Sequence, residues 1–352
     1  MTTSTTTQAP QKRSFGDRVM GIVGDPQILR LIIILILLIG FFMIVRTGAF
    51  VRISTWQSMG VAFPEFGLMA LGVMLTMITG GIDLSAVGIA NMTAITSASV
   101  MLAMAPTGAT TGEQLTAMLV GIVISIVLGV IAGAFNGFLV AKVKIPAILV
   151  TLGTLELFTG IAIVITAGKP LSGLPPIFSE TLGAKVAKIP MQLIIFAIVA
   201  VLIWFILSKM AFGAKLYMLG SNATAAKFSG LNSVSLLVRT YALSGLCAGV
   251  AGLVMMANYN SAKADYGMTY TLLTVLIVVL GGVSPLGGSG KLIGVVLAIA
   301  VLQILQSGLN TFPQISNFYL PLIWGATLLI VISTANISGG WLGRFRKKKE
   351  QS

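Results

Sequence analysis

The chain has 352 residues, of which 56% are hydrophobic and only 9% are charged. Soluble domains carry about a quarter charged residues, so this composition excludes a soluble fold and indicates a polytopic membrane protein. The net charge of +13 does not indicate nucleic-acid binding, because Lys and Arg gather in short loops and at the two ends of the chain. There is no histidine and only one cysteine, Cys247, which excludes His-based catalytic triads, His metal sites and an internal disulfide.

Residues 1–27 form a polar N-terminal segment, and the first hydrophobic run after them is too late and too long for a cleaved signal peptide. Hydrophobic runs of about 17 to 25 residues can cross a bilayer as helices. We therefore expect an all-α membrane domain over residues 28–338 with about ten transmembrane helices, followed by a basic tail at 339–352. The expected spans are 28–46, 60–79, 84–104, 115–140, 145–167, 190–208, 236–257, 269–283, 291–310 and 317–336.

The distribution of basic residues predicts the orientation of these spans. With the N-terminus inside, 16 of the 22 Lys and Arg residues fall on the cytoplasmic side and 6 fall outside. Because cytoplasmic loops carry the excess of Lys and Arg, both termini are expected to be cytoplasmic, and the number of spans to be even.

A Gly-Gly pair follows an apolar run in each half of the chain, at Gly80–Gly81 and at Gly281–Gly282. Glycine can end a helix at membrane depth, and transporters often build their pathway from paired broken helices in two repeats. Both pairs are therefore predicted as helix breaks or re-entrant points along a substrate pathway.

Three acidic residues lie in or beside the expected spans. Asp83 follows the first Gly-Gly pair at the expected start of a helix, where a capping role and a pathway role are equally open. Glu65 follows a proline about one turn inside the outer interface, where its carboxylate can reach water. Glu156 lies deepest, so we expect it to need a polar partner or to lie on the pathway. Asn91 and Asn136 can supply hydrogen bonds inside the helix bundle.

The outside loop over residues 168–190 contains three prolines, which favour extended or turning backbone over a continuous helix. It can face a soluble partner outside the membrane or serve as a connector.

The longest basic interruption, residues 209–235, is expected to be a cytoplasmic loop. Asn222 can cap a short helix that contains Ala225 and Ala226, and Gly230 supplies its stop. A short helix with small residues on its surface suits a groove on a partner protein. An ordinary solvated loop is the alternative from these residues alone.

No nucleotide-binding loop is present. The nearest candidate, GGVSPLGGSGKL, has Pro285 where a phosphate loop needs glycine, and Leu292 where it needs Ser or Thr. Asp83 is the only aspartate in or beside the expected spans, so an aspartyl protease dyad is also missing. We therefore expect no enzyme activity and no cofactor on this chain, and any ATP and Mg²⁺ would be bound by a partner.

Four segments carry a resemblance that covers nearly all of the membrane region. They read GVMLTMITGGIDLSAVGIANM from Gly72, FNGFLVAKVKIPAILVTLGT from Phe135, FGAKLYMLGSNATAAKFSGLNSVSLLVRTYALSGLCAGVAGLV from Phe212 and VLGGVSPLGGSGKLIGVVLAIAVLQILQSGLN from Val279. The chain resembles the permease subunits of ribose-type carbohydrate ABC importers, which are multi-pass proteins of the bacterial plasma (inner) membrane.

The resemblance implies three partners. A cytoplasmic ATPase would dock on the loop, an external solute-binding protein would deliver substrate, and a second copy or a related permease would complete the pathway. The residues that match the family's coupling motif are Gly220, Asn222, Ala225, Ala226 and Gly230.

The solute class stays open at this point. Many sugar permeases carry an acidic, alanine-rich run before the second Gly-Gly pair, whereas this chain reads DYGMTYTLLTVLIVVLGGVSP. Pentoses, hexoses, polyols and sugar-derived signals all fit. Two further hypotheses are an ion-coupled secondary transporter that uses Glu65 or Glu156, and an ABC permease for branched-chain amino acids.

Overall fold

The structure is a computed structural model that describes residues 25–312, 314, 319, 321–327 and 329. Within these residues, eight helices are long and apolar enough to cross a membrane. They are α2 (Pro26–Val45), α4 (Ile53–Ile78), α5 (Ala86–Met104), α6 (Thr111–Phe138) with its π-helical extension η1 (Leu139–Val143), α7 (Ala147–Thr166), α9 (Met191–Lys209), α12 (Ser233–Tyr259) and α14 (Leu292–Leu309). The shorter elements are α3 (Thr47–Phe50), β1 (Leu171–Ser172), α8 (Pro176–Leu182), β2 (Lys185–Val186), β3 (Ile189–Pro190), α10 (Ala211–Ser221), α11 (Ala223–Phe228), β4 (Ser261–Ala262) and α13 (Tyr270–Leu280).

The all-α membrane fold is confirmed, and eight of the expected spans correspond to the eight long helices. The expected span at 269–283 is wrong, because α13 has only 11 residues. It is about 16 Å long, roughly half of what a bilayer crossing requires. The expected span at 317–336 lies largely outside the described residues.

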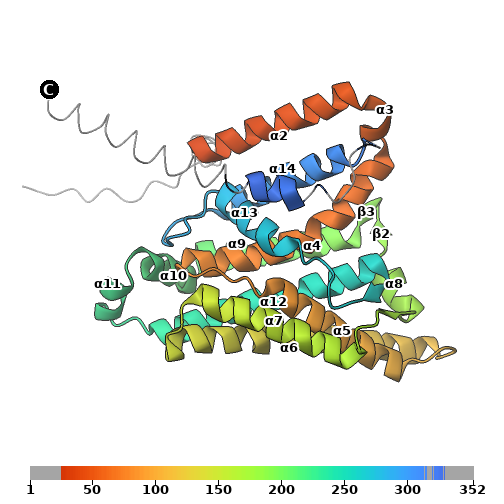
Figure 1. Ribbon diagram of the computed structural model, residues 1–352, viewed down its shortest axis with the longest axis horizontal. Coiled ribbons are helices and arrows are strands. Elements are labelled where there is room, and N and C mark those ends of the chain that lie inside the picture. The colour runs from red at the N-terminus through yellow and green to blue at the C-terminus, as the bar shows by residue number, and fades with distance from the viewer. Residues whose placement is uncertain (1–24, 313, 315–318, 320, 328, 330–352) are drawn as a thin grey trace, which may run out of the picture.

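Two helices form the centre of the array. In Figure 1, α2 and α14 lie along one edge and α6 and α7 along the other, with α4 and α12 between them. In the most hydrophobic stretch of α4, 83% is buried inside the structure, and in that of α12, 78% is buried. In the corresponding stretch of α2 only 17% is buried. Thus α4 and α12 form the core, and α2 shows most of its surface to the surroundings.

Glycine allows α6 and α12 to pack backbone against backbone. A Cβ atom added at Gly133 would overlap the carbonyl of Tyr241, and one added at Gly245 would overlap the carbonyl of Gly129. Small residues permit this close approach between membrane helices. This backbone contact holds α12 against α6 in the core.

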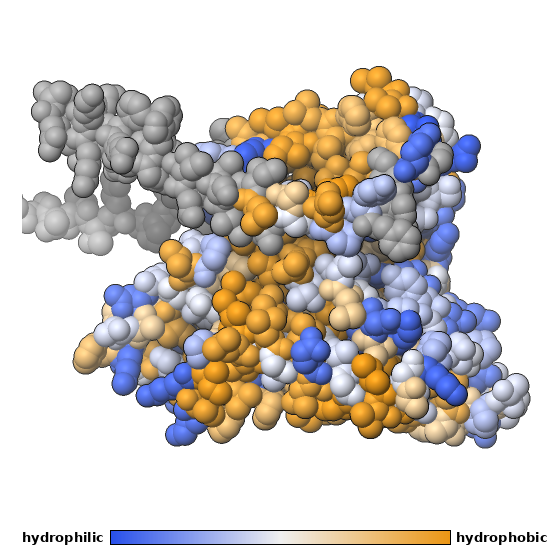
Figure 2. All heavy atoms as spheres, viewed as in Figure 1, coloured by the Kyte–Doolittle hydropathy of each residue, from blue (hydrophilic) through white to orange (hydrophobic). Residues whose placement is uncertain are grey.

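The two ends of the array carry different elements. The α11 end consists of α10, α11 and the loop between α13 and α14, and the N-terminal end of α2 lies beside that loop (Figure 1). The α8 end consists of α8 and the short strands, in which β1 pairs with β4 and β2 with β3. Figure 2 shows hydrophilic side chains gathered at both ends with an apolar band between them. The expected loop at 168–190 therefore contains a short helix and two-residue strands, and no helix that crosses the array.

Candidate coupling and translocation site

The first helix break lies between α4 and α5, where residues 79–85 are not helical. Gly80 has a φ of +86°, a conformation that favours glycine. Gly81 lies against the hydroxyl of Tyr241 on α12 and the side chain of Ala147 on α7, so a Cβ atom there would crowd both. The break is therefore enclosed by other helices.

Asp83, in this break, is 1% exposed and accepts three hydrogen bonds. The donors are the Ser85 backbone N–H at 3.0 Å, the Ser85 hydroxyl at 2.6 Å and the Ser244 hydroxyl at 2.7 Å. The Asn136 side-chain amide in turn donates to the Ser85 hydroxyl at 2.7 Å. Asp83 thus ties the break to α12 directly and to α6 through Ser85, and Ser85 rather than Asp83 is the N-cap residue of α5.

Two buried polar atoms beside this network have no hydrogen-bond partner among the described residues. They are the amide oxygen of Asn136 and the hydroxyl of Tyr241. Asn91 lies elsewhere: its amide donates to the carbonyls of Ala264 at 2.8 Å and Tyr266 at 2.9 Å, and joins α5 to the segment that follows β4. Asn136 therefore joins α6 to the first break, and Asn91 joins α5 to the segment that follows β4.

The second break is the loop over residues 281–291 between α13 and α14. Gly281 packs against Val295 of α14, and Gly282 has a φ of +85°. The Lys291 ammonium forms an ion pair with Asp25 at 2.7 Å, which fixes the loop to the start of α2. This hydrogen bond from Lys291 holds the pKa of the Asp25 carboxyl below its usual range.

The two breaks meet each other at Gly220. The backbone N–H of Gly288 donates to the carbonyl of Ile78, the last residue of α4, at 2.9 Å. A Cβ atom at Gly287 would lie 2.8 Å from the backbone nitrogen of Gly80. A Cβ atom at Gly220, in α10, would overlap both the Ile78 carbonyl and the Gly288 nitrogen. One glycine of the predicted coupling motif therefore lies in contact with both helix breaks.

The rest of the coupling motif forms α11, in agreement with the predicted short helix. The Asn222 side chain caps it by accepting a hydrogen bond from the Ala225 N–H at 2.9 Å. Gly230 has a φ of +78° just beyond its end. Ala226 is buried, whereas Asn222, Ala225 and Gly230 are exposed at the α11 end.

Two exposed apolar residues at this end are absent from the sequence-based candidates. Phe228 in α11 is 88% exposed, and Leu286 in the second break is 89% exposed. The sequence motif does not indicate either residue, because its members are all small or polar. For Phe228, the presence of an aromatic residue in a short basic loop could have indicated an exposed contact residue.

Glu65 is completely buried, which corrects the expectation that it reaches water. Its carboxylate accepts hydrogen bonds from the Asn258 amide, from the Tyr259 hydroxyl at 3.0 Å and from the Tyr270 hydroxyl at 2.9 Å. These donors come from the end of α12 and the start of α13, which sequence spacing did not connect to α4. Glu65 therefore joins three helices.

Glu156 differs from the other two acids. It lies on α7, is exposed, and makes no hydrogen bond or ion pair with any residue that the structure describes. The expected polar partner is therefore not found within this chain's described residues.

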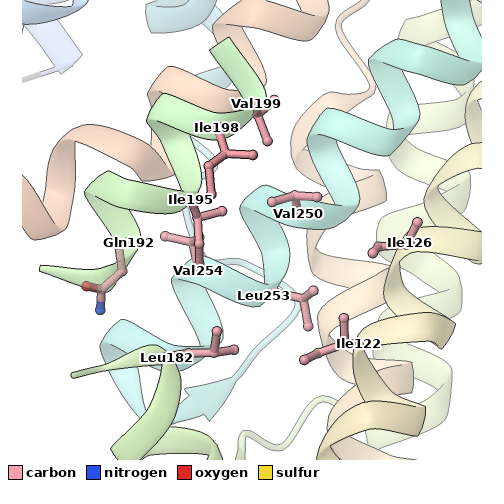
Figure 3. Close-up of a pocket in the computed structure, with 10 residues that line it drawn as sticks. All are labelled: Ile122, Ile126, Leu182, Gln192, Ile195, Ile198, Val199, Val250, Leu253 and Val254. Atoms are coloured by element: carbon pink, nitrogen blue, oxygen red, sulfur yellow. The ribbon is translucent and has the colours of Figure 1, made fainter. Parts of the chain in front are cut away.

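A cavity of about 250 Å³ lies between α6, α8, α9 and α12 (Figure 3). Its lining is apolar apart from Gln192, whose amide points away from the other side chains (Figure 3). A polar solute needs hydrogen-bonding groups in its site, so this cavity does not suit one. No group of three or more Cys, Asp or Glu residues that could hold a metal ion occurs among the described residues.

The long apolar helices are those of a polytopic membrane protein whose two helix breaks meet beside a short helix at one end. The chain belongs to the family described as "Branched-chain amino acid transport system / permease component", whose model matches residues 55–332. It is a multi-pass component of an ABC importer in a bacterial inner membrane.

Named relatives cover most of the chain. It is 33% identical over 269 residues to the ribose import permease protein RbsC of Bacillus subtilis (strain 168), with 76% of this chain and 80% of the relative aligned. It is 28% identical to the D-allose transport system permease protein AlsC of Escherichia coli (strain K12), over 76% of this chain and 78% of the relative. It is also 28% identical to the autoinducer 2 import system permease protein LsrD of Photorhabdus temperata, over 80% and 85%. No solved structure matches the chain significantly.

Proposed function

We propose that this permease forms the translocation pathway for a sugar or a similar small polyhydroxylated solute. The description of the family names branched-chain amino acids, and an amino-acid permease is the alternative. Relatives named for ribose and allose favour the sugar. Competition of uptake by ribose or by leucine separates the two alternatives, and inhibition by leucine alone would contradict the sugar proposal.

The energy comes from a separate cytoplasmic ATPase that binds ATP and Mg²⁺. The contact of Gly220 with Ile78 and Gly288 carries this part of the proposal. Because the contact involves backbone atoms, a displacement of α10 must displace the end of α4 and the second break with it. Movement of the ATPase would in this way change both breaks together and open the pathway to alternate sides.

The ATPase docks on Phe228 and Leu286. Each is nearly 90% exposed. Phe228 lies on α11, which directly follows α10, and Leu286 lies in the second break, which Gly220 of α10 contacts. A few residues carry most of the affinity of many protein interfaces, and an aromatic or aliphatic side chain that enters a pocket on the partner can serve as such an anchor. Lys227 on α11 and Lys215 on α10 add positive charge, so the ATPase groove is expected to carry acidic residues.

A second permease, either another copy or a related chain, completes the pathway. An external solute-binding protein approaches the opposite end of the array, where α8 and the short strands lie. The cytoplasmic location of both termini, predicted from the basic residues, agrees with docking of the ATPase at the α11 end.

The test is co-purification of an ATPase with the tagged chain. Phe228→Glu and Leu286→Glu are each expected to reduce the recovered ATPase at least about tenfold, because an interface anchor of this kind contributes 2 kcal/mol or more. Val186→Glu places the same change on a half-exposed residue at the α8 end and serves as the matched control. Full recovery of the ATPase with both variants would contradict the docking surface.

A further inference from the structure

The carboxylate of Glu156 is exposed halfway along a membrane-spanning helix. Glu156 is the tenth of the 20 residues of α7, about 14 Å from each end of the helix. A charged side chain that faces lipid at this depth is costly, and such residues face the bundle interior or a water-filled cavity. The mid-span position of Glu156 therefore favours water or a protein partner over lipid on this side of α7.

The exposed sides of α6 and α9, unlike that of α7, carry no charged residue in the middle of the helix. On α6, the exposed residues in the corresponding stretch are Val123, Val127 and Ile131, and α9 exposes Ile198 and Val201. These sides are uniformly apolar, as lipid contact requires. Among the charged residues that the structure describes, Glu156 alone is both exposed and central in a span. Figure 2 shows hydrophilic side chains interrupting the apolar surface where Figure 1 draws α7.

Two glycines flank Glu156 on the same side of α7. Gly153 and Gly160 lie three residues before and four residues after Glu156, so all three share one face of the helix. A Cβ atom added at either glycine would meet no other atom within 4 Å. The carboxylate therefore projects between two gaps in the helix surface.

We propose that this face of α7 lines a water-filled pathway that a second copy of the chain completes, and that Glu156 accepts hydrogen bonds from solute hydroxyls. We call it the Glu156 face: Gly153, Glu156 and Gly160, flanked by Leu149 and Leu152. A two-fold axis places the same surface of both copies together, so a self-complementary face is needed. This one offers both gaps at its glycines and exposed leucines that can enter them. The second copy and the role toward hydroxyls both rest on the proposed function, whereas the exposure of Glu156 to water does not.

The location of the face is tested by thiol labelling. Cys247 is the only cysteine and is buried, so Cys247→Ala gives a cysteine-free background. In that background, Glu156→Cys is treated in membranes with a charged, water-soluble methanethiosulfonate, and Ile131→Cys on α6 is the matched control. Glu156→Cys is expected to react on the order of 100-fold faster, because the thiolate that reacts does not form in lipid. Equal and slow labelling of both variants would overturn the proposal.

The second copy is tested with the same variant. A short bifunctional thiol reagent is expected to join two chains carrying Glu156→Cys into a species of twice the mass, and not two chains carrying Ile131→Cys. Rapid labelling from water without a cross-linked dimer would overturn the assignment of the partner as a second copy.

The solute contact is tested by uptake. Glu156→Gln keeps a hydrogen-bond acceptor and is expected to lower uptake about fivefold, whereas Glu156→Leu removes it and is expected to lower uptake at least about tenfold. Wild-type uptake by Glu156→Leu would overturn the solute contact. Labelling needs neither ATP nor sugar, so it tests the location of the Glu156 face independently of the proposed sugar transport. Either result can fail while the other stands.

Discussion

The backbone N–H of Gly288 donates a hydrogen bond to the carbonyl oxygen of Ile78 at 2.9 Å. Ile78 is the last residue of α4, so its carbonyl oxygen accepts no hydrogen bond from within its own helix. The bond joins the break after α13 to the break after α4, two segments that are about 200 residues apart in the sequence. Gly220 packs against both partners of the bond, which makes this junction the point where a movement of α10 reaches the membrane helices.

Replacing Gly220 by alanine is expected to disrupt the junction. The new Cβ atom would meet backbone atoms of Ile78 and Gly288, which no change of side-chain rotamer can relieve. Overpacking of this kind costs about 1–3 kcal/mol, and we expect a lower melting temperature together with loss of ATP-driven uptake. Gly112→Ala is the control, because a Cβ atom there meets nothing within 4 Å. Wild-type stability and uptake with Gly220→Ala would contradict the junction.

Asp83 is expected to act in stability rather than in contact with the solute. Asp83→Ala leaves the hydroxyls of Ser85 and Ser244 without their buried acceptor, at a cost of about 2–4 kcal/mol. Asp265→Ala, which breaks an exposed ion pair with Lys263, is expected to change the stability far less. Thermal unfolding of the purified variants in detergent measures the difference. Loss of uptake with unchanged stability in Asp83→Ala would instead indicate a pathway carboxylate.

The ion pair between Asp25 and Lys291 makes the free energy of unfolding depend on pH. Its hydrogen bond lowers the pKa of the Asp25 carboxyl in the folded protein, so the pair stabilises the fold above the unfolded pKa of about 3.9. This contribution is lost as the pH falls through the lower, folded pKa. Asp25→Asn is expected to reduce the free energy of unfolding by less than about 1 kcal/mol at pH 7, because the Lys291 side chain is largely exposed.

The same pair offers an internal control. Lys291→Gln is expected to show the same small loss, and the double variant no more than either single variant, since all three remove one interaction. The loss is expected to be constant between about pH 5 and pH 8 and to shrink at lower pH. A loss that grows on acidification would contradict the assigned direction of the pKa shift.

Local signals in the sequence predicted much of this structure. Hydrophobic length located the eight long helices, and Asn222 and Gly230 marked the two ends of α11. The break at Gly80 was predicted from a Gly-Gly pair that follows an apolar run, and the φ of +86° at Gly80 is a conformation that few other residues adopt readily.

Features that depend on contacts between distant helices were not predictable in this way. The burial of Glu65 requires Tyr259 and Tyr270, which lie about 200 residues away. The exposure of Glu156 depends on which face of α7 packs against α5, and periodicity is weak in a helix that is apolar nearly all round. The place of Gly220 between the two breaks likewise arises only when α10 folds back on the array.

The most direct test of the central proposal is uptake by the complex that co-purifies with the tagged chain. The complex is reconstituted into liposomes with ATP enclosed or absent, and entry of labelled ribose is measured in the presence of the external binding protein. We predict uptake only with ATP, and its loss with Phe228→Glu. Uptake by the isolated chain under an ion gradient alone, without an ATPase, would contradict the proposal.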